Sequence, residues 1–143
     1  MATHIRDLER SLQRTNHFIH ELQTNLGWDD EQRVYTALRA TLQQLRNRLT
    51  IEEATDFAAQ LPLILKGVFY DGWNPSKTPE KIDKTAFLNR IHAHLNNNPN
   101  INPDLTVRII FLTLKDHITG GEIDHVRNVL PKDIASLWGL EII

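Results

Sequence analysis

Apolar residues recur at helical spacing along the chain and predict an all-α protein. The first set lies at Ile5, Leu8, Leu12, Ile19, Leu22 and Leu26. These residues are three, four or seven positions apart, so they line one face of a helix over about residues 4 to 26. A second set predicts the next helix and comprises Val34, Leu38, Leu42, Leu45 and Leu49. No stretch alternates β-branched and polar residues for long enough to indicate a strand.

Glycine, aspartate and proline mark where these helices begin and end. Gly27 follows the first apolar set, where a left-handed residue closes a helix, and Asp29 or Asp30 can cap the second helix. Two Leu-Pro pairs occur later, at residues 61–62 and 130–131. Proline fits the first turn of a helix and not its interior, so each pair predicts the start of a short further helix.

Two threonine and glutamate pairs are expected to act as structural caps. Thr50 and Glu53 have the spacing of a capping box. In this motif the threonine hydroxyl accepts from the backbone N–H of the glutamate, and the glutamate carboxylate accepts from the backbone N–H of the threonine. Thr119 and Glu122 repeat this spacing. We therefore expect both pairs to open helices.

The second half of the chain repeats the first. A shift of 69 positions lays residues 15–69 over residues 84–138 without a gap. The identical pairs include Phe18/Phe87, Leu26/Leu95, Arg39/Arg108, Leu45/Leu114, Thr50/Thr119, Glu53/Glu122, Leu61/Leu130 and Pro62/Pro131. Most are core or cap residues, as expected where a fold was duplicated. We predict two tandem, pseudo-symmetric units of about four helices each, packed into one domain over residues 1–143, with a linker at 71–83.

Composition places the chain among ordinary globular proteins. It has 143 residues, of which 41% are hydrophobic and 24% charged, and a net charge of −2. That balance gives no overall field to attract nucleic acid or an anionic membrane, so neither is expected as a partner. The absence of cysteine excludes disulfides and thiolate chemistry. No apolar run approaches the roughly 20 residues that span a bilayer, and no secretory core follows Met1, so we expect a cytoplasmic protein.

Glu122 and His125 are the strongest candidates for metal ligands. A glutamate and a histidine at this spacing on facing helices occur in carboxylate di-iron bundles, and Glu53 with Asp56 stands at the equivalent place. Both glutamates already have a role as capping partners, however, and a di-iron site needs carboxylates from two further helices. The prediction is therefore no metal and no cofactor, with Glu122 and His125 kept as outside candidates.

Arginines follow one another on the first predicted helix, at Arg6, Arg10 and Arg14. Residues 1–50 hold seven arginines against six acidic residues, so the helix carries no net positive stripe of the kind that tracks phosphates. We interpret these arginines as a solvated face and His17 and His20 as solvated histidines.

An aromatic segment beside the linker is the candidate ligand or partner surface. Tyr70 and Trp73 have no aromatic counterpart in the second unit, unlike Phe69, which matches Trp138. Their rings carry polar groups suited to a partly wet surface. The alternative is that they pack the linker over the seam between the units. Asp71, Tyr35 and Trp28 complete the candidate set.

Several segments together resemble a known family. They are Leu-Gly-Trp-Asp at 26–29, Tyr-Thr-Ala-Leu-Arg-Ala at 35–40, Arg-Asn-Arg-Leu at 46–49 with Glu-Ala at 53–54, Ala-Gln-Leu-Pro at 59–62, Gly-Val-Phe-Tyr-Asp-Gly-Trp at 67–73, Gly-Glu-Ile at 121–123, Leu-Pro at 130–131 and Leu-Trp at 137–138. Their order and spacing resemble the prokaryotic domain of unknown function 2267 family. The resemblance implies a helical two-repeat fold of about this length, and it implies no particular activity.

Two functions of different classes remain open. The first is a non-enzymatic helical module that binds a protein or a small molecule, which the lack of clustered acid–base or nucleophilic residues favours. The second is a small-molecule or metal-dependent enzyme with a site in the cleft between the units. A deep polar pocket at the seam would favour the enzyme, and a flat apolar surface would favour the module. The sequence leaves the oligomeric state open.

Overall fold

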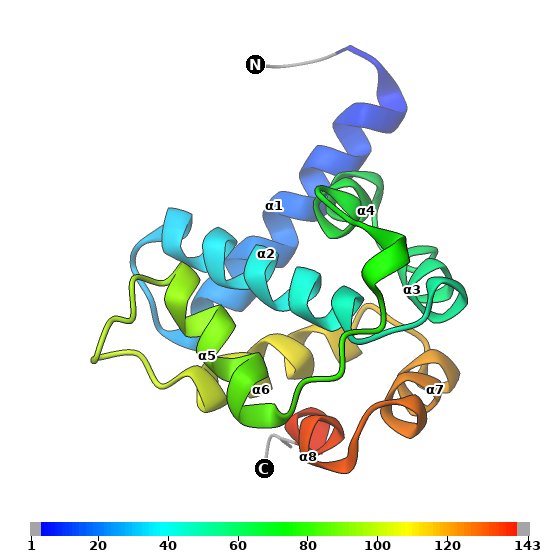
Figure 1. The fold of residues 1–143 in the computed structure, drawn as a ribbon. Coiled ribbons are helices and arrows are strands. Elements are labelled where there is room, and N and C mark those ends of the chain that lie inside the picture. Colours follow the sequence, from blue (N-terminus) through cyan, green and yellow to red (C-terminus); the bar gives the residue numbers. More distant parts are fainter. Residues whose placement is uncertain (1–3, 140–143) are drawn as a thin grey trace.

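The apolar periodicity and the caps produce a chain of helices. The structure, a computed structural model, describes residues 4–139, and within that range it contains no strand. The elements are α1 (Arg6–Leu26), α2 (Glu31–Asn47), α3 (Ile51–Ala58), α4 (Leu63–Tyr70), the 3₁₀ turn η1 (Pro75–Lys77), α5 (Lys84–His94), α6 (Pro103–Lys115), α7 (Gly120–Val129), α8 (Lys132–Ala135) and the 3₁₀ turn η2 (Ser136–Gly139) (Figure 1). The predicted all-α class is confirmed.

The turn between α1 and α2 has the expected residues. Gly27 adopts a φ of 71°, which a side chain would strain, and its N–H donates back to the carbonyls of Gln23 and Thr24. Asp30, rather than Asp29, is the N-cap of α2, because its carboxylate accepts from the N–H of Arg33 at 3.2 Å. The short turn reverses the chain, so α2 packs against α1.

The two predicted capping boxes differ. At α3 both contacts are present: the Glu53 N–H donates to the Thr50 hydroxyl at 3.2 Å, and the Thr50 N–H donates to the Glu53 carboxylate at 2.9 Å. At α7 only the threonine contact forms, with the Glu122 N–H donating to Thr119 at 3.3 Å. The Thr119 N–H donates instead to the side-chain carbonyl of Gln60, at 3.2 Å. The predicted role of Glu122 as reciprocal cap is therefore wrong, because a residue of the first half occupies that N–H.

The two halves have matching helix starts and reciprocal contacts. Starts that are 69 positions apart occur at Ile51 and Gly120 and again at Leu63 and Lys132, directly after the two Leu-Pro pairs. Helix α1 packs on α6, while α5 packs on α2 and α3 packs on α7. A two-fold relation between the halves produces such an exchange of partners. Superposition of residues 15–69 on 84–138 remains the prediction that tests it.

One continuous core joins both halves. Its largest fully buried side chains are Trp138, Phe57, Phe69, Phe87 and Phe111. Phe111 and Trp138 stack with their ring centroids 3.9 Å apart, and Phe57 lies 5.5 Å from Phe69. Each aromatic side chain buries roughly 150–250 Å² of surface, so these residues carry much of the packing energy.

The linker at 71–83 is held against α2 and does not form a loose loop. The Glu80 N–H donates to the carbonyl of Asn47 at 2.7 Å, and the Arg48 side chain donates to the carbonyl of Glu80. The Glu80 carboxylate also pairs with Arg90 of α5 at 2.6 Å. These contacts bind the connection to the end of α2 and to the start of the second half.

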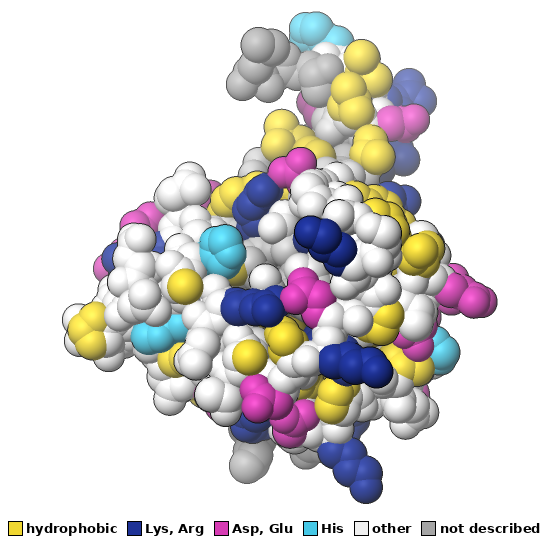
Figure 2. All heavy atoms as spheres, in the orientation of Figure 1, with side chains coloured by type: hydrophobic (Ala, Val, Ile, Leu, Met, Phe, Trp, Pro, Cys, Tyr) yellow, Lys and Arg dark blue, Asp and Glu magenta, His cyan; other side chains and the backbone are white. Residues whose placement is uncertain are grey.

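The N-terminal part of α1 projects beyond the other helices (Figure 1). Its apolar side chains Ile5, Leu8 and Leu12 are 61%, 42% and 39% exposed, while the same face is buried from Thr15 onward. Figure 2 shows apolar side chains on this projecting end. None of the helices in residues 4–139 is both long and apolar enough to cross a membrane.

Candidate functional site

A cleft of about 580 Å³ lies at the seam between the two halves. Helix α1 forms one wall, the α3–α4 junction forms the second, and the end of α6 with the following turn forms the third. The residues that line it are Arg10, Gln13, Arg14, His17, Phe18, Ala59, Gln60, Leu61, Pro62, Leu65, Leu114 and His117. The cleft lies where the chain turns beside α1, between the end of α3 at Ala58 and the start of α4 after Pro62.

The α1 wall of the cleft is cationic. Arg10, Arg14 and His17 lie about one turn apart on one side of the helix, and all three are exposed. Neither arginine forms an ion pair with any residue in the described part of the chain. None of the described residues that line the cleft carries a carboxylate. The wall therefore presents two positive charges that form no ion pair with a described residue, with Asp7 one turn before Arg10.

Two contacts fix His117 at the other side of the cleft. Its Nε2 lies 3.0 Å from the Glu21 carboxylate on α1, and the Phe18 ring meets it edge-on with centroids 5.0 Å apart. Glu21, one turn after His17 on α1, is thus already engaged. The imidazole holds the second half against the first at the mouth of the cleft.

The floor of the cleft is apolar. Leu61, Leu65 and Leu114 are buried beneath it together with Phe18. Gln60 lies beside this floor, where it caps α7 through Thr119. A ligand in the cleft would meet positive charge on one side and hydrocarbon below, as in many small-molecule sites.

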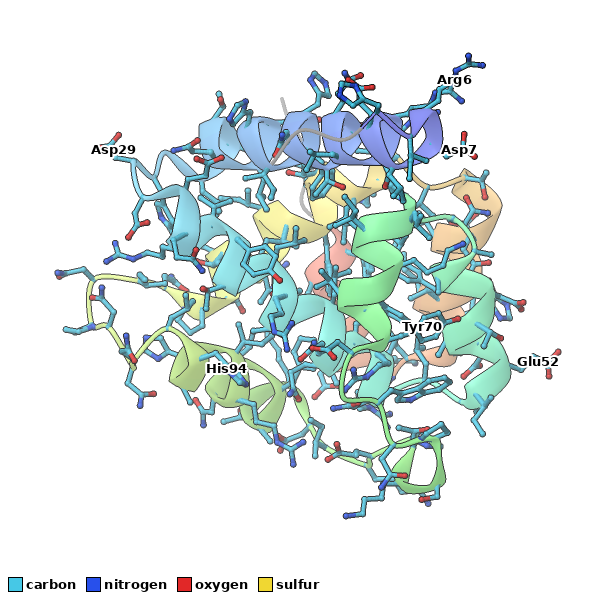
Figure 3. All side chains as sticks on the ribbon, turned by 90° about the horizontal axis from the view of Figure 1, so that it is seen from above. Arg6, Asp7, Asp29, Glu52, Tyr70 and His94 are labelled. Carbon is cyan, nitrogen blue, oxygen red and sulfur yellow. The ribbon has the colours of Figure 1, made fainter. Side chains whose placement is uncertain are left out.

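The aromatic segment predicted as a surface is partly built into the core. Tyr70 and Trp73 stack on each other with centroids 5.4 Å apart, and Tyr70 meets Phe69 edge-on at 5.6 Å. Both are half-buried and pack against the core, and the indole Nε1 of Trp73 is buried without a hydrogen-bond partner. Tyr70 lies at the end of α4, far from the projecting Arg6 and Asp7 (Figure 3).

Arg46 holds this segment in place, a role that was not predicted from the sequence. The side chain is only 5% exposed, and its Nη1 donates to the carbonyl of Phe69 at 3.0 Å and to that of Asp71 at 2.9 Å. Burial lowers its pKa below the usual range for arginine. The sequence did contain a sign that Arg46 is buried. Arg46 is one turn after Leu42 and so borders the apolar stripe of α2.

A second arginine of α2 contacts the same segment from the surface. Arg39 donates to the Asp71 carboxylate at 2.9 Å, and this hydrogen bond, together with one to Tyr35, raises the pKa of the guanidinium. Both side chains of the ion pair are exposed to solvent. Tyr35 and Trp28 are half-buried and pack on the core. Neither residue lines the cleft.

The outside metal candidates do not gather further ligands. Burial raises the pKa of Glu122, nearby Asp56 adds to the rise, and His125 opposes it. Within residues 4–139, no group of three or more histidine, aspartate or glutamate side chains is placed to hold a metal ion. Glu122 and His125 are on α7 and outside the cleft.

Comparison with known proteins supplies a family and no activity. No curated protein matches the chain. Residues 15–137 match the family described as "Uncharacterized conserved protein (DUF2267)", and the match begins one residue after Arg14. It spans the cleft floor, Gln60, His117 and both halves of the fold. Since the match covers most of its length, the chain belongs to the domain of unknown function 2267 family.

Proposed function

We propose that this protein is a non-enzymatic, cytoplasmic helical module that binds an anionic ligand in the cleft at the seam of its two halves. The observation that carries the proposal is the pair Arg10 and Arg14. They face a 580 Å³ cleft without an ionic partner and without a carboxylate among its lining residues. A volume of this size falls within the usual range of ligand sites, about 300–1,000 Å³.

Electrostatics supports an anion in particular. Arg39, Arg90 and Arg108 each form an ion pair with an acidic side chain. Arg10 and Arg14 instead share a wall with His17, the Glu21 carboxylate pairs with His117, and Asp7 lies outside the 580 Å³ cleft, in the hollow that adjoins it. A carboxylate or phosphate in the cleft can accept bidentate hydrogen bonds from a guanidinium, which makes arginine well suited to such groups.

Titration with small anions followed by NMR tests the proposal. Inorganic phosphate and glutarate should each shift the amide signals of His17, Gln60 and His117, while the signal of Trp73 stays in place. Arg14→Gln should weaken the response several-fold, and Arg33→Gln, which removes an exposed arginine remote from the cleft, should leave it unchanged. Absence of any shift, or shifts that gather around Trp73, would overturn the proposal.

One observation favours an enzyme in the same cleft. The contact between His117 and Glu21 orients an imidazole, as the carboxylate of a catalytic dyad does. The described lining residues, however, contain no serine, cysteine, lysine or carboxylate that could act as a nucleophile beside it. Turnover of a phosphate or carboxylate ester that disappears in His117→Gln would support the enzyme, and binding without turnover would support the module.

A further inference from the structure

The cleft continues along α1 as a longer groove. A second hollow of about 200 Å³ adjoins it, lined by Asp7, Arg10, Ser11, Arg14, Pro62 and Leu63. The two hollows share Arg10, Arg14 and Pro62, so they form one groove along the helix. From Asp7 to Phe18 this groove follows twelve residues of α1, and the eleven helical rises between them span about 17 Å.

The groove repeats one pattern of contacts along its length. Arg10 and Arg14 lie on its α1 side, one turn apart, roughly 6 Å between their β-carbons. On the other side are Leu61 and Leu65 in the larger hollow and Leu63, which is 54% exposed, in the smaller. A bound molecule therefore meets paired positive charges beside a row of leucines. Asp7 provides the one negative charge, at the outer end.

We propose that the natural ligand of this groove is an acidic, amphipathic segment of a partner protein. The inference rests on the proposed function and names the partner. Glutamate or aspartate side chains one helical turn apart would match the spacing of Arg10 and Arg14, and apolar side chains on the adjoining face would contact the leucines. An elongated chain can contact both hollows of a groove about 17 Å long. A single phosphate or dicarboxylate contacts only one of them.

A hydrogen bond joins the two sides of the groove at its narrow end. The Ser11 hydroxyl accepts from the N–H of Ile64 at 3.1 Å, which fixes α1 against the first turn of α4. Leu63, next to this bond, lines the smaller hollow and is exposed. Figure 3 shows that Arg6, just beyond this point, extends away from the body.

Selection from a displayed peptide library on the full-length protein tests the proposal. Enriched peptides should carry two acidic residues three or four positions apart together with leucine-like residues. A labelled synthetic copy of the enriched sequence should bind in fluorescence anisotropy, and a copy with its acids changed to amides should not. Arg10→Glu and Arg14→Glu should each weaken binding about tenfold. Arg6→Glu is the matched control, because it makes the same charge change on the same helix outside both hollows, and it should leave affinity unchanged.

The outcomes separate this inference from the proposed function. If phosphate and glutarate bind at the cleft but no acidic peptide is enriched, the partner segment is overturned and the anion site stands. If neither the small anions nor an acidic peptide binds, both the anion site and the partner segment are overturned. Circular dichroism must show that the Arg10 and Arg14 variants are folded, and Arg14→Gln provides a milder change. A dimer of the free protein that dissociates in Arg14→Glu would identify a second copy as the occupant and overturn the partner segment.

Discussion

Replacing Arg46 by methionine should destabilise the fold far more than the same change at Arg39. Both residues belong to α2 and both contact Asp71, but Arg46 is 5% exposed and donates to two backbone carbonyls. Each hydrogen bond from a charged donor contributes about 1.5–3 kcal/mol, and the cost of burying the charge offsets part of this. We expect Arg46→Met to lower the unfolding free energy by about 2–4 kcal/mol, equivalent to roughly 10 °C in melting temperature for a chain of this size.

Arg39→Met provides the internal standard. Its partner is the Asp71 carboxylate, and the exposed fractions of the two side chains are 39% and 63%. Ion pairs this exposed contribute about 0–1 kcal/mol, so the urea midpoint should move little. Asp71→Asn should behave like Arg39→Met, because it keeps the backbone carbonyl that Arg46 contacts. If Arg39→Met cost as much as Arg46→Met, the buried arginine would not be the anchor of the linker.

Three further experiments test other parts of the structure. Glu122→Gln should raise the urea midpoint at pH 7 and lose this gain near pH 4, because burial raises the carboxyl pKa and an ionised Glu122 destabilises the fold; a gain that grew on acidification would contradict this. Thr50→Ala should cost about 1 kcal/mol in denaturant unfolding through loss of the capping hydroxyl, and an unchanged midpoint would refute the assignment. Phe69→Ala should cost about 3–5 kcal/mol. If the double variant Tyr70→Ala and Trp73→Ala costs as much, these two aromatics hold the linker and present no surface.

Local sequence rules predicted the helices well, and long-range contacts account for what they missed. Periodicity, Gly27 and the threonine at position 50 depend on residues within a few positions of one another, so they could be interpreted directly. The N–H of Thr119 is taken by Gln60, which lies 59 positions earlier, and no local pattern encodes that contact. Likewise, the cleft that Arg10 lines is formed with residues 59–65 and 114–117, which lie far from Arg10 in the sequence.

A cleft between the units was among the predicted alternatives, but the residues that line it were not predicted, for a related reason. Counting charges along residues 1–50 averages the arginines with six acids, none of which lines the 580 Å³ cleft, although Asp7 lines the adjoining hollow. Folding separates most of these acids from the cleft. It places Arg10 and Arg14 beside a leucine floor from the α3–α4 junction and α6, and it commits Glu21 to His117. The net charge of a segment therefore gave no measure of the charge in the cleft.

The boundary of the family match falls within the groove. The leucine floor, Gln60 and His117 lie within residues 15–137, whereas Arg10 and Arg14 lie on the exposed extension of α1 before them. A change in the extension alters the charge offered to a ligand without disturbing the buried helices. A relative with the same leucine floor but other side chains on this extension would form the same groove with a different preference for the charge of its ligand. Under the proposed function, the projecting end of α1 sets the charge of the groove and the rest of the fold sets its shape.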